Sequence, residues 1–133
     1  MQFRTFKYNK LVRDKMVERS EATGSIVHWQ KLNDTDFEQA LRIKCMEEAE
    51  EIFSAGTKQD LLEELADMLE IMNAFCDIYE VTLQDVVAIQ KEKYQERGGF
   101  KDHIFISTAE HQVGSFGEQY CLADPTKYPE VKK

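Results

Sequence analysis

Apolar and polar residues alternate with a helical period over most of the chain. Between residues 58 and 79, apolar side chains recur every three or four positions, a spacing that places them on one side of a helix. The same spacing, bounded by polar and glycine residues, predicts further helices before and after this segment. The helices predicted in this way cover residues 11–22, 35–54, 58–79 and 83–97.

Three of these helices carry a capping signal at their start. A threonine stands there, and an acidic residue follows three positions later, so that the two side chains can satisfy backbone N–H groups of the first turn. The three pairs are Thr35 with Glu38, Thr57 with Asp60, and Thr82 with Asp85. Glycines after the periodic segments predict where helices end, and these are Gly24, Gly56 and Gly98.

Two short runs depart from the helical pattern. Residues 25–32 and 103–106 are rich in β-branched and aromatic side chains, which is compatible with two short strands that pair with each other. The segment 108–133 contains both prolines and little periodicity, so we expect an irregular tail. The prediction is an all-α domain over residues 1–107, a bundle of about four main helices with at most one short strand pair, followed by that tail.

Composition narrows the classes of function. The 133 residues are 42% hydrophobic and 32% charged, which is typical of a soluble globular protein, and no apolar run approaches the length that spans a bilayer. The formal net charge of −8 argues against coating a nucleic acid, because phosphate backbones are bound by an excess of Lys and Arg. We therefore expect no membrane and no nucleic-acid polymer as partner, and the cytoplasm as the location.

Acidic side chains interrupt the apolar faces of the second and third predicted helices. On the third helix, Glu64 falls inside the apolar arc and Asp67 lies at its edge one turn later, whereas the other acids of that helix point to the opposite side. On the second helix, the apolar stripe is continued by Lys44, Glu47, Glu48 and Glu51. The short turn between the two helices makes them antiparallel neighbours, so the two acidic patches are expected to face each other.

Four ionised carboxylates on facing stripes repel one another unless a cation lies between them. Hard divalent cations prefer oxygen ligands of this kind. We therefore expect Glu48, Glu51, Glu64 and Asp67 to bind Mg²⁺, or Mn²⁺ in its place. The alternative is that acidic helices carry these residues as solvated charge, which is the better interpretation for any one of them taken alone.

Basic residues are candidates for contacts with phosphate. Lys44 continues the acidic stripe of the second helix. Lys93 and Arg97 are spaced four apart in the last turns of the fourth helix, where they equally suit the helix dipole. Lys10 and Arg13 lie near the N-terminus, and they either reach a phosphate across a subunit boundary or belong to an exposed helix start.

Several segments in order resemble a known family. Residues 44–51 (KCMEEAEE) followed by 64–67 (ELAD) are similar to the EExxE…ExxD signature of the MazG-like, all-α nucleotide pyrophosphohydrolases, a superfamily that includes dimeric dUTPases and phosphoribosyl-ATP pyrophosphatase. Residues 8–15 (YNKLVRDK) and 96–100 (ERGGF) resemble a phosphoribosyl-ATP-pyrophosphohydrolase-like subgroup. The resemblance extends from about residue 8 to 106.

The resemblance implies a magnesium-dependent enzyme that splits a nucleoside triphosphate into a monophosphate and pyrophosphate. It implies a homo-dimer or tetramer, the four carboxylates as metal ligands, Glu47 as the residue that orients or deprotonates the attacking water, and phosphate contacts for Lys93 and Arg97. Two alternatives stay open, namely a phosphoribosyl-ATP pyrophosphatase and a non-enzymatic acidic helical interaction module. An oligomer also follows from the second helix, which is apolar on nearly all sides and so is expected to pack on both.

Overall fold

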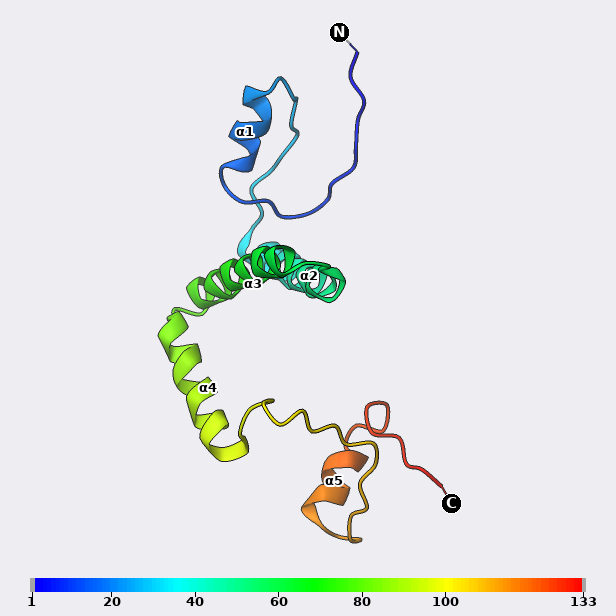
Figure 1. Ribbon diagram of the computed structural model, residues 1–133. Helices are drawn as coiled ribbons and strands as arrows, with labels where there is room; N and C mark the ends of the chain where they lie inside the picture. The colour runs from blue at the N-terminus through cyan, green and yellow to red at the C-terminus, as the bar shows by residue number, and fades with distance from the viewer. Residues whose placement is uncertain (1, 133) are drawn as a thin grey trace. The chain divides into compact units, whose positions relative to one another are not determined.

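Residues 2–132 are described by a computed structural model, and within this range the chain is all-helical with no strand (Figure 1). The helices are α1 (Met16–Ala22), α2 (Asp34–Ser54), α3 (Lys58–Ile78), α4 (Leu83–Arg97) and α5 (Phe116–Leu122). The chain divides into two compact units, Met1–Gln95 and Glu96–Lys133. The predicted domain boundary after residue 107 stays a prediction. Within residues 2–132, no helix combines the length and apolarity needed to cross a membrane.

The predicted caps of α3 and α4 are confirmed. The N–H of Asp60 donates to Thr57 Oγ1 at 3.0 Å. At the start of α4 the contact is reciprocal, because the N–H of Asp85 donates to Thr82 Oγ1 at 3.2 Å and the N–H of Thr82 donates to Asp85 Oδ2 at 2.8 Å. Aspartate thus closes a capping box in the way usually described for glutamate.

Helix α2 begins before the threonine that was expected to cap it. Asn33 is the cap instead, since its Oδ1 accepts a hydrogen bond from the N–H of Asp36 at 2.8 Å. Thr35 lies inside the first turn. Asparagine is among the strongest N-cap residues. Because Asn33 lies two residues before Thr35, the helix begins at Asp34.

Helix α1 is shorter than predicted, because it begins at Met16 and not at residue 11. The residues before it are not helical, and two of them, Lys10 and Arg13, form ion pairs with α2 and α3. These ion pairs hold the segment against α2 and α3, so that it does not extend α1. The predicted end is confirmed, since Gly24 follows α1 with φ of +93°, a left-handed conformation that glycine adopts without strain.

The predicted strand pair is wrong, because residues 2–132 contain no strand. Residues 25–32 have the side chains of a strand but no partner strand, and a ladder requires two. In the run 103–106, His103 has φ of +57° and its N–H closes a turn onto Phe100 O at 3.2 Å. This left-handed residue interrupts the extended backbone that pairing needs.

The expectation of a wholly irregular tail is also wrong, because α5 lies within it. Ser115 caps this helix by accepting from the N–H of Glu118 at 3.3 Å, and Glu118 Oε1 accepts from the N–H of Gly114 at 2.9 Å. The rings of Tyr120 and Tyr128 lie 5.5 Å apart and tie the end of the chain to the helix. Ser-x-x-Glu is a capping signal, and residues 115–118 of the sequence match it.

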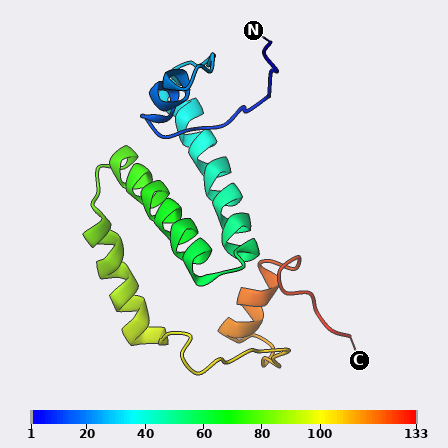
Figure 2. The same cartoon turned by 45° about the horizontal axis from the view of Figure 1, so that its top comes forward.

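Helices α2 and α3 form an antiparallel hairpin, seen side by side in Figure 1 and Figure 2, and they are the only helices within residues 2–132 that pack against each other. Leu41, Ile71 and Cys76 are the buried apolar residues of the described chain, and Cys45 Sγ contacts Met68 Sδ at 3.8 Å across the hairpin. The all-α class is confirmed. A bundle of four helices is not seen in the single chain, and the hairpin alone positions the candidate site.

Candidate metal centre

The hairpin brings together three of the four predicted metal ligands. One carboxylate oxygen from each of Glu48, Glu51 and Glu64 lies within 4.8 Å of the others. Glu48 and Glu51 are one turn apart on α2, so they share a face, and the antiparallel packing sets Glu64 of α3 opposite them. These three residues are called the glutamate cluster below. Glu63, the neighbour of Glu64, is exposed, as the helical periodicity of α3 predicts.

Glu48 is the most buried residue of the cluster, with only 3% of its surface exposed. Its Oε1 is buried without a hydrogen-bond partner, and so is Oε2 of Glu64. Buried carboxylate oxygens in folded proteins are normally paired, because removing them from water without a partner is unfavourable. Two such oxygens on facing helices fit the demand of a hard cation for oxygen ligands.

Two carboxyl groups of the cluster have a raised pKa. Burial, then a hydrogen bond with the Glu64 carboxyl group and the charges of Glu51 and Asp67, together raise the pKa of Glu48 to about 8. The pKa of Glu51 is raised as well, chiefly because the Glu64 carboxyl group lies against it. Carboxyl groups whose ionisation is disfavoured by burial and by neighbouring carboxyl groups are suited to exchanging a proton for a divalent cation.

Asp67, the fourth predicted ligand, lies near the cluster but outside it. Its charge helps to raise the pKa of Glu48. Its Oδ1, however, accepts a hydrogen bond of 2.6 Å from Arg13 Nη2. The structure therefore places Asp67 beside the cluster and pairs it with a cation from the chain itself.

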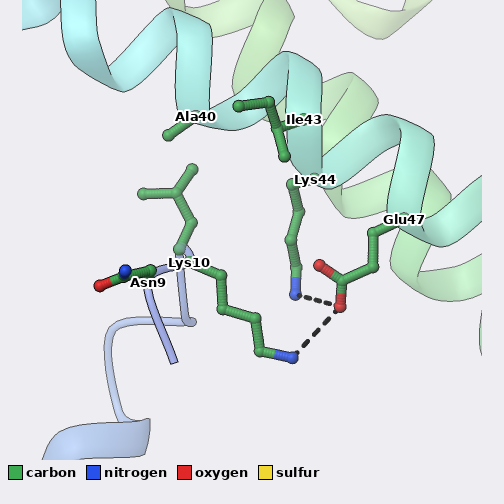
Figure 3. A pocket seen from close by; sticks show the side chains of 7 residues that line it. Asn9, Lys10, Ala40, Ile43, Lys44 and Glu47 are labelled. Carbon is green, nitrogen blue, oxygen red and sulfur yellow. Dashed lines mark hydrogen bonds and ion pairs between the residues drawn. The ribbon is translucent and has the colours of Figure 1, made fainter. Parts of the chain in front are cut away.

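Glu47 faces two lysines, Lys10 and Lys44 (Figure 3). Lys10 Nζ lies 3.2 Å and Lys44 Nζ 3.7 Å from the same oxygen, Oε1. The hydrogen bond from Lys10, and then the charge of Lys44, hold the pKa of Glu47 below its ordinary value. Glu47, with a lowered pKa, is thus an ionised carboxylate next in sequence to Glu48, whose pKa is raised.

A small pocket lies between α2 and the segment that carries Lys10 (Figure 3). It is lined by Asn9, Lys10, Leu11, Ala40, Ile43, Lys44 and Glu47. Sequence reasoning missed Asn9, Leu11 and Ile43 as parts of a site, since only the fold brings the N-terminal segment against α2. Asn9 has φ of +47°, and asparagine tolerates this left-handed conformation better than most residues.

The remaining two candidates for phosphate binding lie on α4. Lys93 and Arg97 are exposed, and α4 does not pack against α2 or α3 in the described part of the chain. Neither residue has a salt bridge with the carboxylates described above. Their contact with phosphate stays a prediction.

Comparison of the chain with known protein families, with characterised proteins and with solved structures finds no match. The site must therefore be interpreted from its own residues. Its main features are one buried carboxylate oxygen without a partner on each of Glu48 in α2 and Glu64 in α3, and two lysines that converge on a single oxygen of Glu47.

The raised pKa of Glu48 leads to a prediction for stability. In EDTA, the melting temperature is expected to fall as the pH rises from about 5 to 8. Over this range the folded state keeps a proton on Glu48, whose pKa is about 8, whereas the unfolded chain has lost it, with an ordinary value of 4.5. The folded state then binds more protons, so the free energy of unfolding decreases with rising pH. Calorimetry at several pH values measures this slope.

Glu48→Gln is the matched control for that experiment, since it removes the titrating group and should flatten the slope. Excess Mg²⁺ should raise the melting temperature more at pH 8 than at pH 5, because the cation competes with protons for the same oxygens. Equal slopes for Glu48→Gln and the unchanged protein would contradict the interpretation.

Proposed function

We propose that this protein is a Mg²⁺-dependent hydrolase that cleaves a nucleoside triphosphate into a monophosphate and pyrophosphate. The observation that carries the proposal is the buried Glu48, whose Oε1 lacks a partner and lies in a cluster with Glu51 and Glu64. Exposed acidic side chains are solvated and would not by themselves indicate a bound cation. A carboxylate that is 3% exposed and unpaired needs a cation or a proton to be stable in the fold.

The donor set fits magnesium, and Mn²⁺ as a substitute. Glu48, Glu51 and Glu64 would hold the cation, and Asp67 would complete the set from α3. All of these donors are carboxylate oxygens, with no histidine or cysteine that would favour zinc. Bound Mg²⁺ would supply neutralisation of phosphate charge and lower the pKa of a bound water molecule.

Glu47 would act on the attacking water, and the two lysines would act on phosphate. Glu47 is ionised and lies next to the cluster, so it can accept a hydrogen bond from the attacking water and orient it. Lys10 and Lys44 converge on one Glu47 oxygen, which leaves one positive charge in excess at the pocket. That excess favours a phosphate group, which lysine binds as a point charge.

A panel of nucleotides tests the proposal. Pyrophosphate release is measured with Mg²⁺, with Mn²⁺ and with EDTA, on standard and modified nucleoside triphosphates and on phosphoribosyl-ATP. Metal-dependent release supports a hydrolase, and preference for phosphoribosyl-ATP would identify the alternative substrate for the same residues. Complete inactivity, together with a tightly bound protein partner, would favour the non-enzymatic interaction module and refute the proposal.

We also propose that the working form is a homo-oligomer, a dimer or a tetramer. Many large apolar side chains are open to solvent, among them Met46 and Phe53 on α2 and Ile89 on α4. Apolar surface of this extent is expected to be covered by further copies of the chain.

Light scattering at micromolar concentration measures the oligomeric state. We expect two or four copies, with a melting temperature that rises with protein concentration, because association stabilises the folded form by mass action. A monodisperse monomer that unfolds cooperatively would contradict the prediction. Replacing Met46 by glutamate, at a position that is 69% exposed in the single chain, should shift the population toward monomers. Glu50→Gln, a change at an exposed polar position of the same helix, should not.

A further inference from the structure

A short N-terminal segment lies across both helices of the hairpin. We call residues 8–13 the N-terminal arm. Within it, Lys10 pairs with Glu47 of α2, and three residues later Arg13 pairs with Asp67 of α3. The arm thus connects the two helices at the level of the candidate metal centre, through charged groups that belong to the proposed site.

Two basic residues of the arm contact different kinds of carboxylate. Lys10 contacts Glu47, which is outside the glutamate cluster, and Lys44 from α2 itself contacts the same oxygen. Arg13 contacts Asp67, which is expected to be a metal ligand, at 2.6 Å. Both side chains of this second pair are substantially exposed, Arg13 by 59% and Asp67 by 44%, so water can replace either partner when the pair separates.

A divalent cation and Arg13 compete for the same group. Asp67 lies beside the acidic residues of the glutamate cluster. Without metal, the guanidinium group of Arg13 supplies the positive charge that offsets the charge of Asp67. A cation bound to the glutamate cluster and Asp67 places two further positive charges next to Arg13, and like charges at this separation repel. The released guanidinium is suited to phosphate, because its planar array of N–H groups binds two phosphate oxygens at once.

We propose that Arg13 and the divalent cation exchange at Asp67. In the metal-free protein Arg13 holds Asp67, and metal binding frees the arm so that Arg13 binds phosphate oxygens of an anionic substrate. The arm then holds a polyphosphate group only when metal is bound. The contact between Arg13 and the substrate forms after the metal has bound. This inference rests on the proposed function only in taking Asp67 as a metal ligand.

Calorimetric titration with Mg²⁺, in the absence of nucleotide, tests the competition. Arg13→Gln should raise Mg²⁺ affinity by about two- to fivefold, the range that corresponds to loss of one exposed ion pair. In an Asp67→Asn background the same change should have no effect, because the contested carboxylate is gone. Arg42→Gln is the matched control. It also removes an arginine from an ion pair on the hairpin, here with Glu38 at 3.2 Å, and should leave Mg²⁺ affinity unchanged.

Trypsin cleavage after Arg13 tests the movement of the arm. Cleavage should become faster when Mg²⁺ is added, since the side chain leaves Asp67, and slower again when inorganic pyrophosphate is added to the Mg²⁺-loaded protein. The inference is overturned if Arg13→Gln leaves Mg²⁺ affinity unchanged or lowers it, or if Mg²⁺ alone protects the arm. Mg²⁺ binding without these responses would refute only the exchange at Asp67. Absence of any Mg²⁺ binding would refute the proposed function together with it.

Discussion

Replacing Glu64 by glutamine is expected to lower Mg²⁺ affinity and turnover together. The change keeps the shape of the side chain but removes one negative charge opposite Glu48 and Glu51, with which Glu64 forms the glutamate cluster. Loss of a group that only orients metal ligands typically lowers metal affinity 10–100-fold, so loss of a ligand is expected to reach about 100-fold. Titration of turnover with Mg²⁺ at fixed nucleotide should show partial recovery at high metal.

Glu63→Gln is the control for this prediction. Glu63 carries the same charge on the same helix but is exposed, and its side-chain contact is a 3.5 Å hydrogen bond from Gln59 Nε2. Its replacement should leave Mg²⁺ affinity and turnover nearly unchanged. If Glu63→Gln were as damaging as Glu64→Gln, the separation of α3 into a metal-binding side and a solvent side would be wrong.

Replacing Glu47 by glutamine is expected to lower kcat by about 10²–10⁴-fold, the usual effect of losing a general base, while Mg²⁺ still binds. Glu47 lies outside the glutamate cluster, so its loss removes no expected ligand. It does remove the ionised carboxylate that would orient the attacking water. An effect on kcat with metal affinity retained is the signature of a group that acts in the chemical step.

Two measurements separate this effect from a disturbance of the lysines. Lys10 and Lys44 both contact Glu47, so Glu47→Gln also frees two ammonium groups. Pyrophosphate is therefore expected to bind the variant at least as tightly as it binds the unchanged protein. Glu50→Gln, at an exposed position on α2, is the matched control and should keep its kcat. Full kcat in Glu47→Gln, or a loss of Mg²⁺ binding equal to that of Glu64→Gln, would exclude the assigned role.

Local features of the chain could be predicted because short-range interactions decide them. Helix α4 occupies Leu83–Arg97 as expected, since its cap and the following Gly98, with φ of +78°, are contained within a few residues. The two sides of α3 could also be distinguished, because helical geometry turns Glu63 and Glu64 about 100° apart regardless of what surrounds them. The same geometry placed Glu48 and Glu51 on one face of α2.

Strands and the N-terminal segment could not be predicted from local pattern, because their structure depends on partners remote in sequence. Residues 25–32 have the composition of a strand, but a strand exists only where another edge is present. Residues 11–15 have a helical pattern but are not helical, and Arg13 in this stretch is paired with α3. In both places an interaction between distant segments, or its absence, outweighs local preference.

The residue types of the candidate site were determined by the sequence alone, and their pairing was decided only by tertiary structure. The spacing of the acids along α2 and α3 sufficed to direct the glutamate cluster toward one interface. It contained nothing about the pairing of Arg13 with Asp67 across 54 positions, or of Lys10 with Glu47 across 37. Ion pairs of this kind depend on where an irregular segment crosses the helices. The attraction between opposite charges can fix that position only after the hairpin has brought its carboxylates together.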